Sequence, residues 1–270
     1  MNNPTIIEST NETGTVMHNE STINYVLHLA DNALILAQIQ SDWCGHGPIL
    51  EQDIAITNIS LDILGQARNL YQYAALLIGG NTTEDTLAYL RTEREFKNCI
   101  LVEQPNGDWA NTILKLYLFS QFQQVYFQQL INSTDTQLAA IAEKSSKETA
   151  YHVRWSKDWV LRLGDGTAES KTRLQDAINS LWKYTPELFT NASYESTASQ
   201  NGIGVDVTTL QQQWLQAVSD TFSEATLNST LTIPTGWNGL NGKQGVHTEN
   251  MGFILANLQY LQRTYPGCEW

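Results

Sequence analysis

Long segments of helical periodicity, separated by turns that contain glycine or proline, dominate this sequence and restrict what it can fold into. Between Leu138 and Trp159, apolar and small residues recur at steps of three and four, as on one face of a helix. No run of alternating β-branched residues lies between hairpin turns. We therefore expect an all-α antiparallel bundle, with helices near residues 22–41, 51–78, 84–103, 108–132, 134–163, 167–184, 206–227 and 246–264.

The sequence shows no domain boundary within this helical part. Residues 1–20 are polar and lack periodicity, so they are predicted to form a flexible N-terminal tail. Residues 21–270 are predicted to form one helical domain, with additional helices around the bundle. The polar stretch 190–204 is expected to be a mobile crossover loop between helices.

The net charge of −13 argues against a nucleic-acid partner, because phosphate binding depends on clustered Lys and Arg. The N-terminus lacks the basic start and apolar run of a signal peptide, and no stretch reaches membrane-spanning length. The expected location is therefore the cytoplasm, without membrane contact. The three cysteines, Cys44, Cys99 and Cys268, have no C-x-x-C spacing and are expected to be reduced, and buried or inert.

Polar residues interrupt the apolar stripes of two predicted helices. In the helix 51–78 they are Asp62 and Gln66, and in the helix 134–163 they are Glu148 and His152. Burying such groups is unfavourable unless they are paired or bound to metal. The arrangement resembles the ferritin-like carboxylate bundles, in which inward-facing Glu and Glu-x-x-His motifs hold two irons.

The iron-binding motif itself is absent, because no Glu in the chain is followed three residues later by His. Gly65 follows Asp62 at that spacing, and Tyr151 follows Glu148, so His152 comes one residue late. Glu148 and His152 share a helix face and are predicted to meet, either as metal ligands or as a buried charge-assisted pair. The buried pair is favoured, since one imidazole needs further ligands to hold iron.

A weaker cluster consists of His28 and Asp31, which are near neighbours on the first predicted helix. The alternatives to a metal site are a hydrogen bond between helices and a solvated turn. His46 lies in a Gly/Pro loop and is expected to lock a corner or contact a partner. A nucleophilic Cys44 beside His46 is a weaker alternative.

Three other patterns are interpreted as structural. His247 and Glu249 are two residues apart, which places them on different helix faces and argues against a shared metal. The loop 239–245 superficially resembles a phosphate cradle, but Gln244 stands where a P-loop needs Ser or Thr, so an ordinary flexible connection is expected. The basic residues Arg91, Arg94 and Lys97 alternate with acidic ones and predict a solvated, salt-bridged helix face.

Four long stretches resemble the PaaC-type subunits of bacterial phenylacetyl-CoA epoxidases. They are SDWCGHGPILEQDIAITNISLDILGQARNLY at 41–71, EREFKNCILVEQPNGDWANT at 93–112, RLGDGTAESKTRLQDAINSLWKYTPELF at 162–189 and GKQGVHTENMGFILANLQYLQRTYPGCEW at 242–270. The resemblance covers nearly everything after residue 20. It implies a ferritin-like subunit that pairs with a homologous catalytic subunit.

In that family the catalytic partner carries the di-iron centre and epoxidises phenylacetyl-CoA with O2, and a separate reductase component supplies electrons. The PaaC-type chain is regarded as structural, so the resemblance implies no catalytic, cofactor-binding or metal-binding residue here. Asp62, Glu148 and His152 would be degenerate ligand remnants. The first hypothesis is thus a non-catalytic scaffold, and phenylacetyl-CoA would bind mainly to the partner. The alternative is a stand-alone divergent metal oxidase or iron-binding protein that uses His28, Asp31, Glu148 and His152.

Overall fold

The computed structural model describes residues 12–227 and 239–268, and these ranges contain helices and turns but no β-strand. The predicted all-α fold is therefore confirmed. The α-helices are α1 (Glu12–Ser41), α2 (Leu50–Ile78), α3 (Glu84–Tyr89), α4 (Trp109–Leu130), α5 (Thr136–Gly164), α6 (Ala168–Leu181), α7 (Ser193–Gln200), α8 (Gln211–Glu224) and α9 (Glu249–Thr264). The short 3-10 helices are η1 (Glu93–Glu95), η2 (Trp182–Phe189), η3 (Val207–Leu210) and η4 (Gly242–Gln244).

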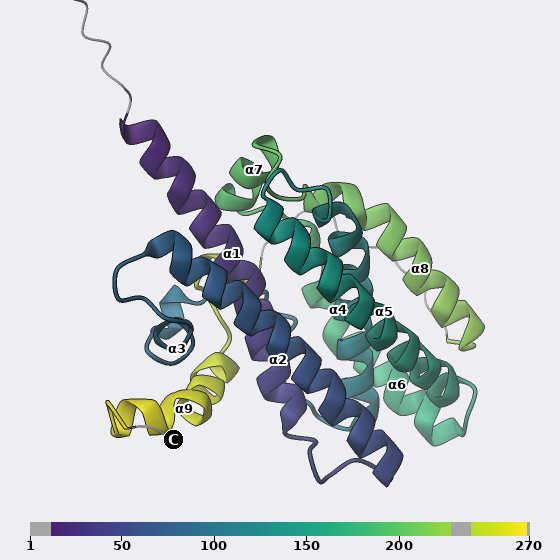
Figure 1. The fold of residues 1–270 in the computed structure, drawn as a ribbon. Helices are drawn as coiled ribbons and strands as arrows, with labels where there is room; N and C mark the ends of the chain where they lie inside the picture. Colours follow the sequence, from purple (N-terminus) through teal and green to yellow (C-terminus); the bar gives the residue numbers. More distant parts are fainter. Residues whose placement is uncertain (1–11, 228–238, 269–270) are drawn as a thin grey trace, which may run out of the picture.

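Two antiparallel helix pairs form the centre of the bundle (Figure 1). α1 packs along α2, α4 packs along α5, and α2 lies beside α5 where the two pairs meet. α6 and α8 pack against α4 and α5, while α7 packs against α1. α3 and α9 contact each other and extend the α1/α2 side. This is the antiparallel bundle with additional helices that the periodicity predicts.

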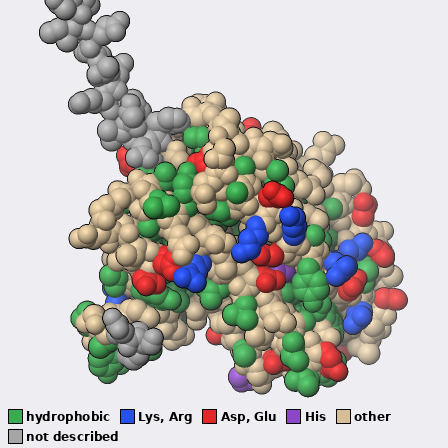
Figure 2. All heavy atoms as spheres, in the orientation of Figure 1, with side chains coloured by type: hydrophobic (Ala, Val, Ile, Leu, Met, Phe, Trp, Pro, Cys, Tyr) green, Lys and Arg blue, Asp and Glu red, His purple; other side chains and the backbone are tan. Residues whose placement is uncertain are grey.

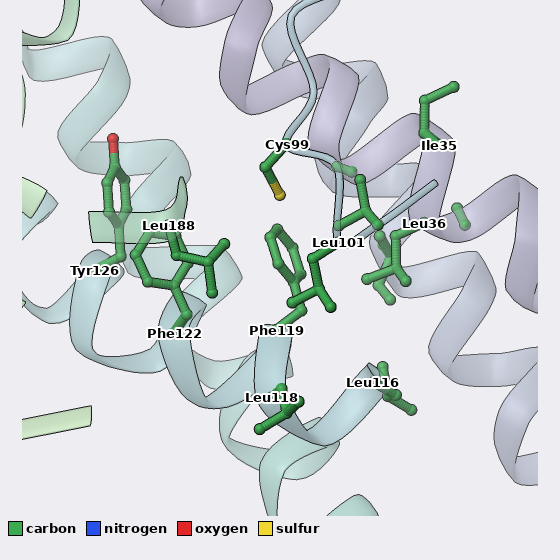
Figure 3. Close-up of a cluster of buried hydrophobic side chains, with 14 of the residues drawn as sticks. Ile35, Leu36, Cys99, Leu101, Leu116, Leu118, Phe119, Phe122, Tyr126 and Leu188 are labelled. Atoms are coloured by element: carbon green, nitrogen blue, oxygen red, sulfur yellow. The ribbon is translucent and has the colours of Figure 1, made fainter. Parts of the chain in front are cut away.

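α4 is the central helix, because its side chains are buried on nearly every side. All residues from Ile113 to Phe119 are buried, which explains why this helix is apolar almost all round. Figure 3 shows Phe119 and Leu116 of α4 in one cluster with Leu36 of α1 and with Leu101 from the segment after η1. Burial of each large apolar side chain contributes about 1.5–3 kcal/mol to stability.

The predicted helix over 84–103 is wrong beyond Tyr89. Residues 96–104, here called the 96–104 segment, run through the core without regular helix. Side chains from other elements take the backbone N–H groups that a helix would use. Lys97 N donates to Asp31 Oδ2 at 2.8 Å, and Cys99 N donates to Asn32 Oδ1 at 2.8 Å. Tertiary hydrogen bonds therefore outweigh the local helical preference.

The stretch 190–204 is not an open loop, so that prediction is also wrong. It contains α7, in which Tyr194 and Glu195 are buried. Tyr194 Oη donates to the carbonyl of Lys243 at 2.8 Å, and Glu195 pairs with the Lys243 ammonium. The stretch therefore combines buried pairing at Tyr194 and Glu195 with exposed polar residues such as Ser193 and Gln200.

α1 begins at Glu12, earlier than the predicted start at residue 22. Residues 1–11 of the predicted tail lie outside the described residues, and the domain division at residue 20 stays a prediction. Within the described ranges, no helix is both long enough and apolar enough to span a membrane.

Candidate functional site

The polar residues predicted on α2 and α5 do face one another, but their partners differ from the prediction. His152 Nε2 lies 3.2 Å from Asp62 Oδ2, and Gln66 Nε2 donates to Glu148 Oε2 at 3.0 Å. α2 and α5 run antiparallel. Asp62 and Gln66, four residues apart on α2, therefore face His152 and Glu148, four residues apart on α5. The predicted pair between Glu148 and His152 is therefore wrong, since each side chain finds its partner on α2.

These two pairs leave several buried polar atoms without a hydrogen-bond partner. They include His152 Nδ1, Gln66 Oε1 and Thr149 Oγ1. Burial lowers the pKa of His152 more than the hydrogen bond and charge of Asp62 raise it, so the imidazole is neutral. Asp62 itself keeps 41% of its side chain exposed. The α2/α5 junction, defined by Asp62, Gln66, Glu148 and His152, is thus only partly closed and only partly satisfied.

The two positions where imidazoles would complete the iron-binding motifs cannot supply ligands. Gly65 has no side chain, and a Cβ placed there would meet nothing within 4 Å. Tyr151 is exposed, with the Arg154 guanidinium 5.5 Å from the centre of its ring.

Beside the junction, the polar side chains that α1 and α4 contribute include the imidazole of His28 and the amides of Asn32 and Gln123. Asn32 of α1, Gln66 of α2 and Gln123 of α4 line a residual cavity of about 20 Å³. That volume holds about one water molecule. Gln123 Oε1 is another buried atom without a partner. No group of three or more His, Cys, Asp or Glu side chains that could hold a metal occurs among residues 12–227 and 239–268.

A di-iron centre therefore does not fit these residues. The junction offers two carboxylates, Asp62 and Glu148, which already pair with His152 and Gln66, and its other groups are neutral amides, a hydroxyl and one neutral imidazole. Two irons need more carboxylates and a second imidazole. The stand-alone oxidase hypothesis also needs His28 and Asp31 near Glu148 and His152, and the structure gives both of them other partners.

His28 and Asp31 are both buried, and they bind other elements instead of each other. His28 Nδ1 donates to the carbonyl of Lys97 at 2.6 Å, and Asn32 Nδ2 lies 3.3 Å from His28 Nε2. Burial lowers the pKa of His28, in spite of the nearby charge of Glu195, which fits a neutral ring with one N–H. Of the alternatives left open by the sequence, the hydrogen bond between elements is confirmed.

Asp31 is the acceptor in a buried ionic cluster. Its carboxylate accepts hydrogen bonds from both terminal nitrogens of Arg91 and from Tyr71 Oη, the latter at 2.5 Å. Arg91 also lies 4.2 Å from the centre of the Phe96 ring. The predicted solvated basic face over Arg91, Arg94 and Lys97 is therefore wrong for Arg91, which is buried because α1 supplies its counter-ion.

The loop 239–245 packs against other elements, and its lysine is paired within the chain instead of being free for a phosphate. Lys243 Nζ is buried against Glu195 Oε2 at 3.0 Å and also donates to the carbonyl of Thr190 at 3.0 Å. Added Cβ atoms at Gly242 and Gly245 would lie 2.2 Å and 2.1 Å from backbone carbonyl oxygens. These glycines let two backbones approach closely, so the expected flexible connection is wrong.

His247 pairs with Glu103 and not with Glu249. Its Nδ1 lies 2.7 Å from Glu103 Oε2 and its Nε2 lies 3.0 Å from the carbonyl of Phe96. Both partners are acceptors, so both nitrogens donate only when the ring is charged. Burial alone would lower the pKa of His247, but the hydrogen bond and charge of Glu103 outweigh it and raise the pKa.

The loop that contains His46 forms a fixed corner between α1 and α2. Trp43 Nε1 donates to Thr112 Oγ1 at 2.9 Å, and Asp53 Oδ1 accepts from the backbone N–H groups of Gly45 and Gly47. His46 is exposed, and its ring reaches only a backbone carbonyl. The predicted corner is confirmed, and the contact from the His46 ring goes to the Cys44 carbonyl and not to its thiol.

The three cysteines differ in solvent exposure. Cys99 is buried, and burial raises its pKa, whereas Cys44 and Cys268 are exposed, so burial holds for Cys99 alone and the inertness expected of the other two stays a prediction.

Sequence reasoning missed several buried charges. Burial lowers the pKa of Lys115 to about 7 and raises the pKa of Glu187 to about 7. Lys115 could have been found, because it interrupts a continuous apolar run in α4. Glu187 and Glu195 had no local signal, since their partners lie far away in the sequence.

The described residues thus form an all-helical bundle in which side-chain pairs join α2 and α5. The family model described as "Phenylacetic acid catabolic protein" matches residues 1–270, so the chain belongs to this family. It is 48% identical over 248 residues to the C component of the 1,2-phenylacetyl-CoA epoxidase of Escherichia coli (strain K12). That alignment covers 91% of this chain and 98% of the relative. The resemblance seen in the sequence is confirmed.

Proposed function

We propose that this chain is the non-catalytic C-type subunit of a phenylacetyl-CoA epoxidase of aerobic phenylacetate catabolism. In this proposal it binds and stabilises a homologous catalytic subunit that holds the di-iron centre and most of the phenylacetyl-CoA site. A reductase component supplies the electrons, and the complex works in the cytoplasm. The chain itself contributes no cofactor and no reacting group.

One observation carries the proposal. At the α2/α5 junction, Asp62 and His152 bind each other and Gln66 binds Glu148, while Gly65 provides no ligand. A relative named as one subunit of an epoxidase, aligned over nearly its whole length, supports a role within an assembly. The paired junction and the alignment together favour a subunit whose helical bundle binds the catalytic subunit, while the partner carries out the reaction with oxygen.

The test is to purify the chain alone and together with the catalytic subunit, and to measure iron and epoxidation in both preparations. We expect the isolated chain to hold far less than one iron per polypeptide and to be inactive. The complex should hold about two irons per catalytic subunit and should turn over. Stoichiometric iron in the isolated chain, or epoxidation by it alone, would overturn the proposal.

A further inference from the structure

α2 carries a second apolar stripe on the side away from the core. Its core side is formed by Ile56, Ile59, Ile63 and neighbouring buried residues. On the opposite side, Leu50, Ile54, Leu61 and Leu64 are 70%, 51%, 59% and 44% exposed. A helix that is apolar on opposite faces is normally covered on both. In the space-filling view, hydrophobic side chains are scattered over this face of the molecule, with charged side chains between them (Figure 2).

The spacing of this stripe is that of a helix-packing seam. Four apolar residues, Leu50, Ile54, Leu61 and Leu64, and the polar Thr57 between them follow one another at alternating steps of four and three, the spacing of coiled-coil core positions. The stripe extends over about 21 Å at 1.5 Å per residue. That length matches one partner helix packed nearly parallel or antiparallel to α2.

Gly65 lies beside the stripe and has no explanation within this chain. It is in the interior of α2, where glycine destabilises a helix relative to alanine. Its backbone does not adopt a positive φ, and an added Cβ would meet nothing within 4 Å. By contrast, Gly242 and Gly245 are each required by a close backbone contact. A surface that closely approaches α2 from outside would account for Gly65.

The charges along this part of α2 indicate which kind of partner fits. From Leu50 to Arg68 the helix carries three acidic residues, Glu51, Asp53 and Asp62, and one basic residue, Arg68, which pairs with Glu84. A second copy packed on the same face would place these carboxylates together, and each copy has a net charge of −13. A different protein with apolar core positions and basic flanking residues is complementary. The mixed charges over α5 would form the polar rim of such an interface.

We propose that the outer face of α2, formed by Leu50, Ile54, Leu61, Leu64 and Gly65, is the docking surface for an apolar helix of the catalytic subunit with basic flanks. This inference rests on the proposed function and adds to it the face through which the subunit binds.

The experiment measures the affinity of full-length variants for the purified catalytic subunit by biolayer interferometry. The α2 variant is Leu61→Lys with Leu64→Lys, which removes apolar area and adds charge that repels a basic partner. We expect its Kd to rise about 100-fold, because central apolar contacts dominate such interfaces. The matched control is Phe253→Lys with Tyr260→Lys on α9, where the side chains are similarly exposed. Its Kd should change less than about threefold.

Gly65→Met provides a second variant in which the isolated fold is preserved. The added side chain meets nothing in the chain itself, so the thermal midpoint should stay the same or rise. Its Kd should nevertheless rise at least about tenfold, because the longer side chain blocks close approach.

The outcomes separate this inference from the proposed function. If wild type binds and both α2 variants bind equally well, the docking surface is wrong and the subunit role stands. Loss of binding only in the α9 variant leads to the same conclusion. If wild type does not bind the catalytic subunit, both proposals fall. A wild-type homodimer that the α2 variants abolish would assign the face to a second copy and overturn the inference.

Discussion

The α2/α5 junction and the ionic network around the 96–104 segment are both built from polar side chains, but they differ in how many hydrogen bonds their carboxylates accept. Both leave buried atoms without partners, Asn98 Oδ1 and Thr248 Oγ1 in the network. At the junction, His152 Nδ1 and Gln66 Oε1 are buried without partners. In the network, the carboxylates of Asp31, Glu103 and Glu195 each accept several hydrogen bonds. The carboxylates that accept the most of these hydrogen bonds therefore lie around the 96–104 segment and not at the α2/α5 junction.

The largest expected effect is that of Asp31→Ala, which leaves the Arg91 guanidinium buried without its counter-ion. Loss of one partner from a buried ion pair typically destabilises by about 3–5 kcal/mol. The free energy of unfolding, measured by urea titration, should fall by that amount. Arg68→Ala serves as the control, since the Arg68–Glu84 pair is exposed and should contribute less than about 1 kcal/mol. Equal losses in the two variants would contradict the comparison.

Glu195→Gln tests the second ion pair of the network and should destabilise the protein by about 3 kcal/mol. The reason is that Lys243 would remain buried without a carboxylate. Adding Lys243→Met should restore part of the loss, since the double variant contains neither charge. A strictly additive double variant would show that the two groups do not depend on each other.

At the junction, His152→Ala should destabilise by about 1–3 kcal/mol, because Asp62 loses its partner and a cavity is left. Asp62 is partly exposed and can be solvated, which places the effect below that of Asp31→Ala. Under the proposed function, the iron content of the complex should not change, and metal analysis of the purified complex checks this. A loss of iron with this variant would reassign the junction to the metal site.

The smallest expected effect is a difference in pH dependence between His247 and His152. The raised pKa of His247 gives a contribution to stability that is fully present below pH 6.5 and is lost as the pH rises through the folded-state pKa. The lowered pKa of His152 has the opposite sign, because protonation of the unfolded chain disfavours folding as the pH falls below 6.5.

Urea titrations from pH 5.5 to 8.5 on His247→Gln and His152→Gln measure this difference. The deficit of His247→Gln relative to wild type should shrink as the pH rises. The deficit of His152→Gln should shrink as the pH falls. If the free energy of unfolding of wild type and both variants varied with pH in parallel, the two histidines would not differ in how their protonation affects stability.

Helices with strong periodicity can be predicted from the sequence, and the expected start of α2 lies within one residue of the observed start. The failures occur where distant residues decide local structure. The 96–104 segment does not form a regular helix, because Asp31, Asn32 and Glu187 accept hydrogen bonds from its backbone N–H groups. No local pattern encodes those bonds, since their partners are more than sixty residues away.

The candidate site shows the same division. Asp62, Glu148 and His152 could be found, because each interrupts an apolar stripe at helical spacing. The partners of these residues could not be predicted, since they depend on the register between α2 and α5. The expected Glu148–His152 pair uses spacing within one helix, whereas the observed pairs use spacing between two helices.

The bonds that Glu103 makes to His247 and Thr248 join residues 144 and 145 positions apart. During translation, Glu103 leaves the ribosome long before these partners exist. At 5–20 residues per second, the delay is on the order of ten seconds or more. The Glu103 carboxylate, which is buried in the finished protein, must therefore stay hydrated during most of the synthesis of the chain. Completion of the core is postponed until the C-terminal part has emerged.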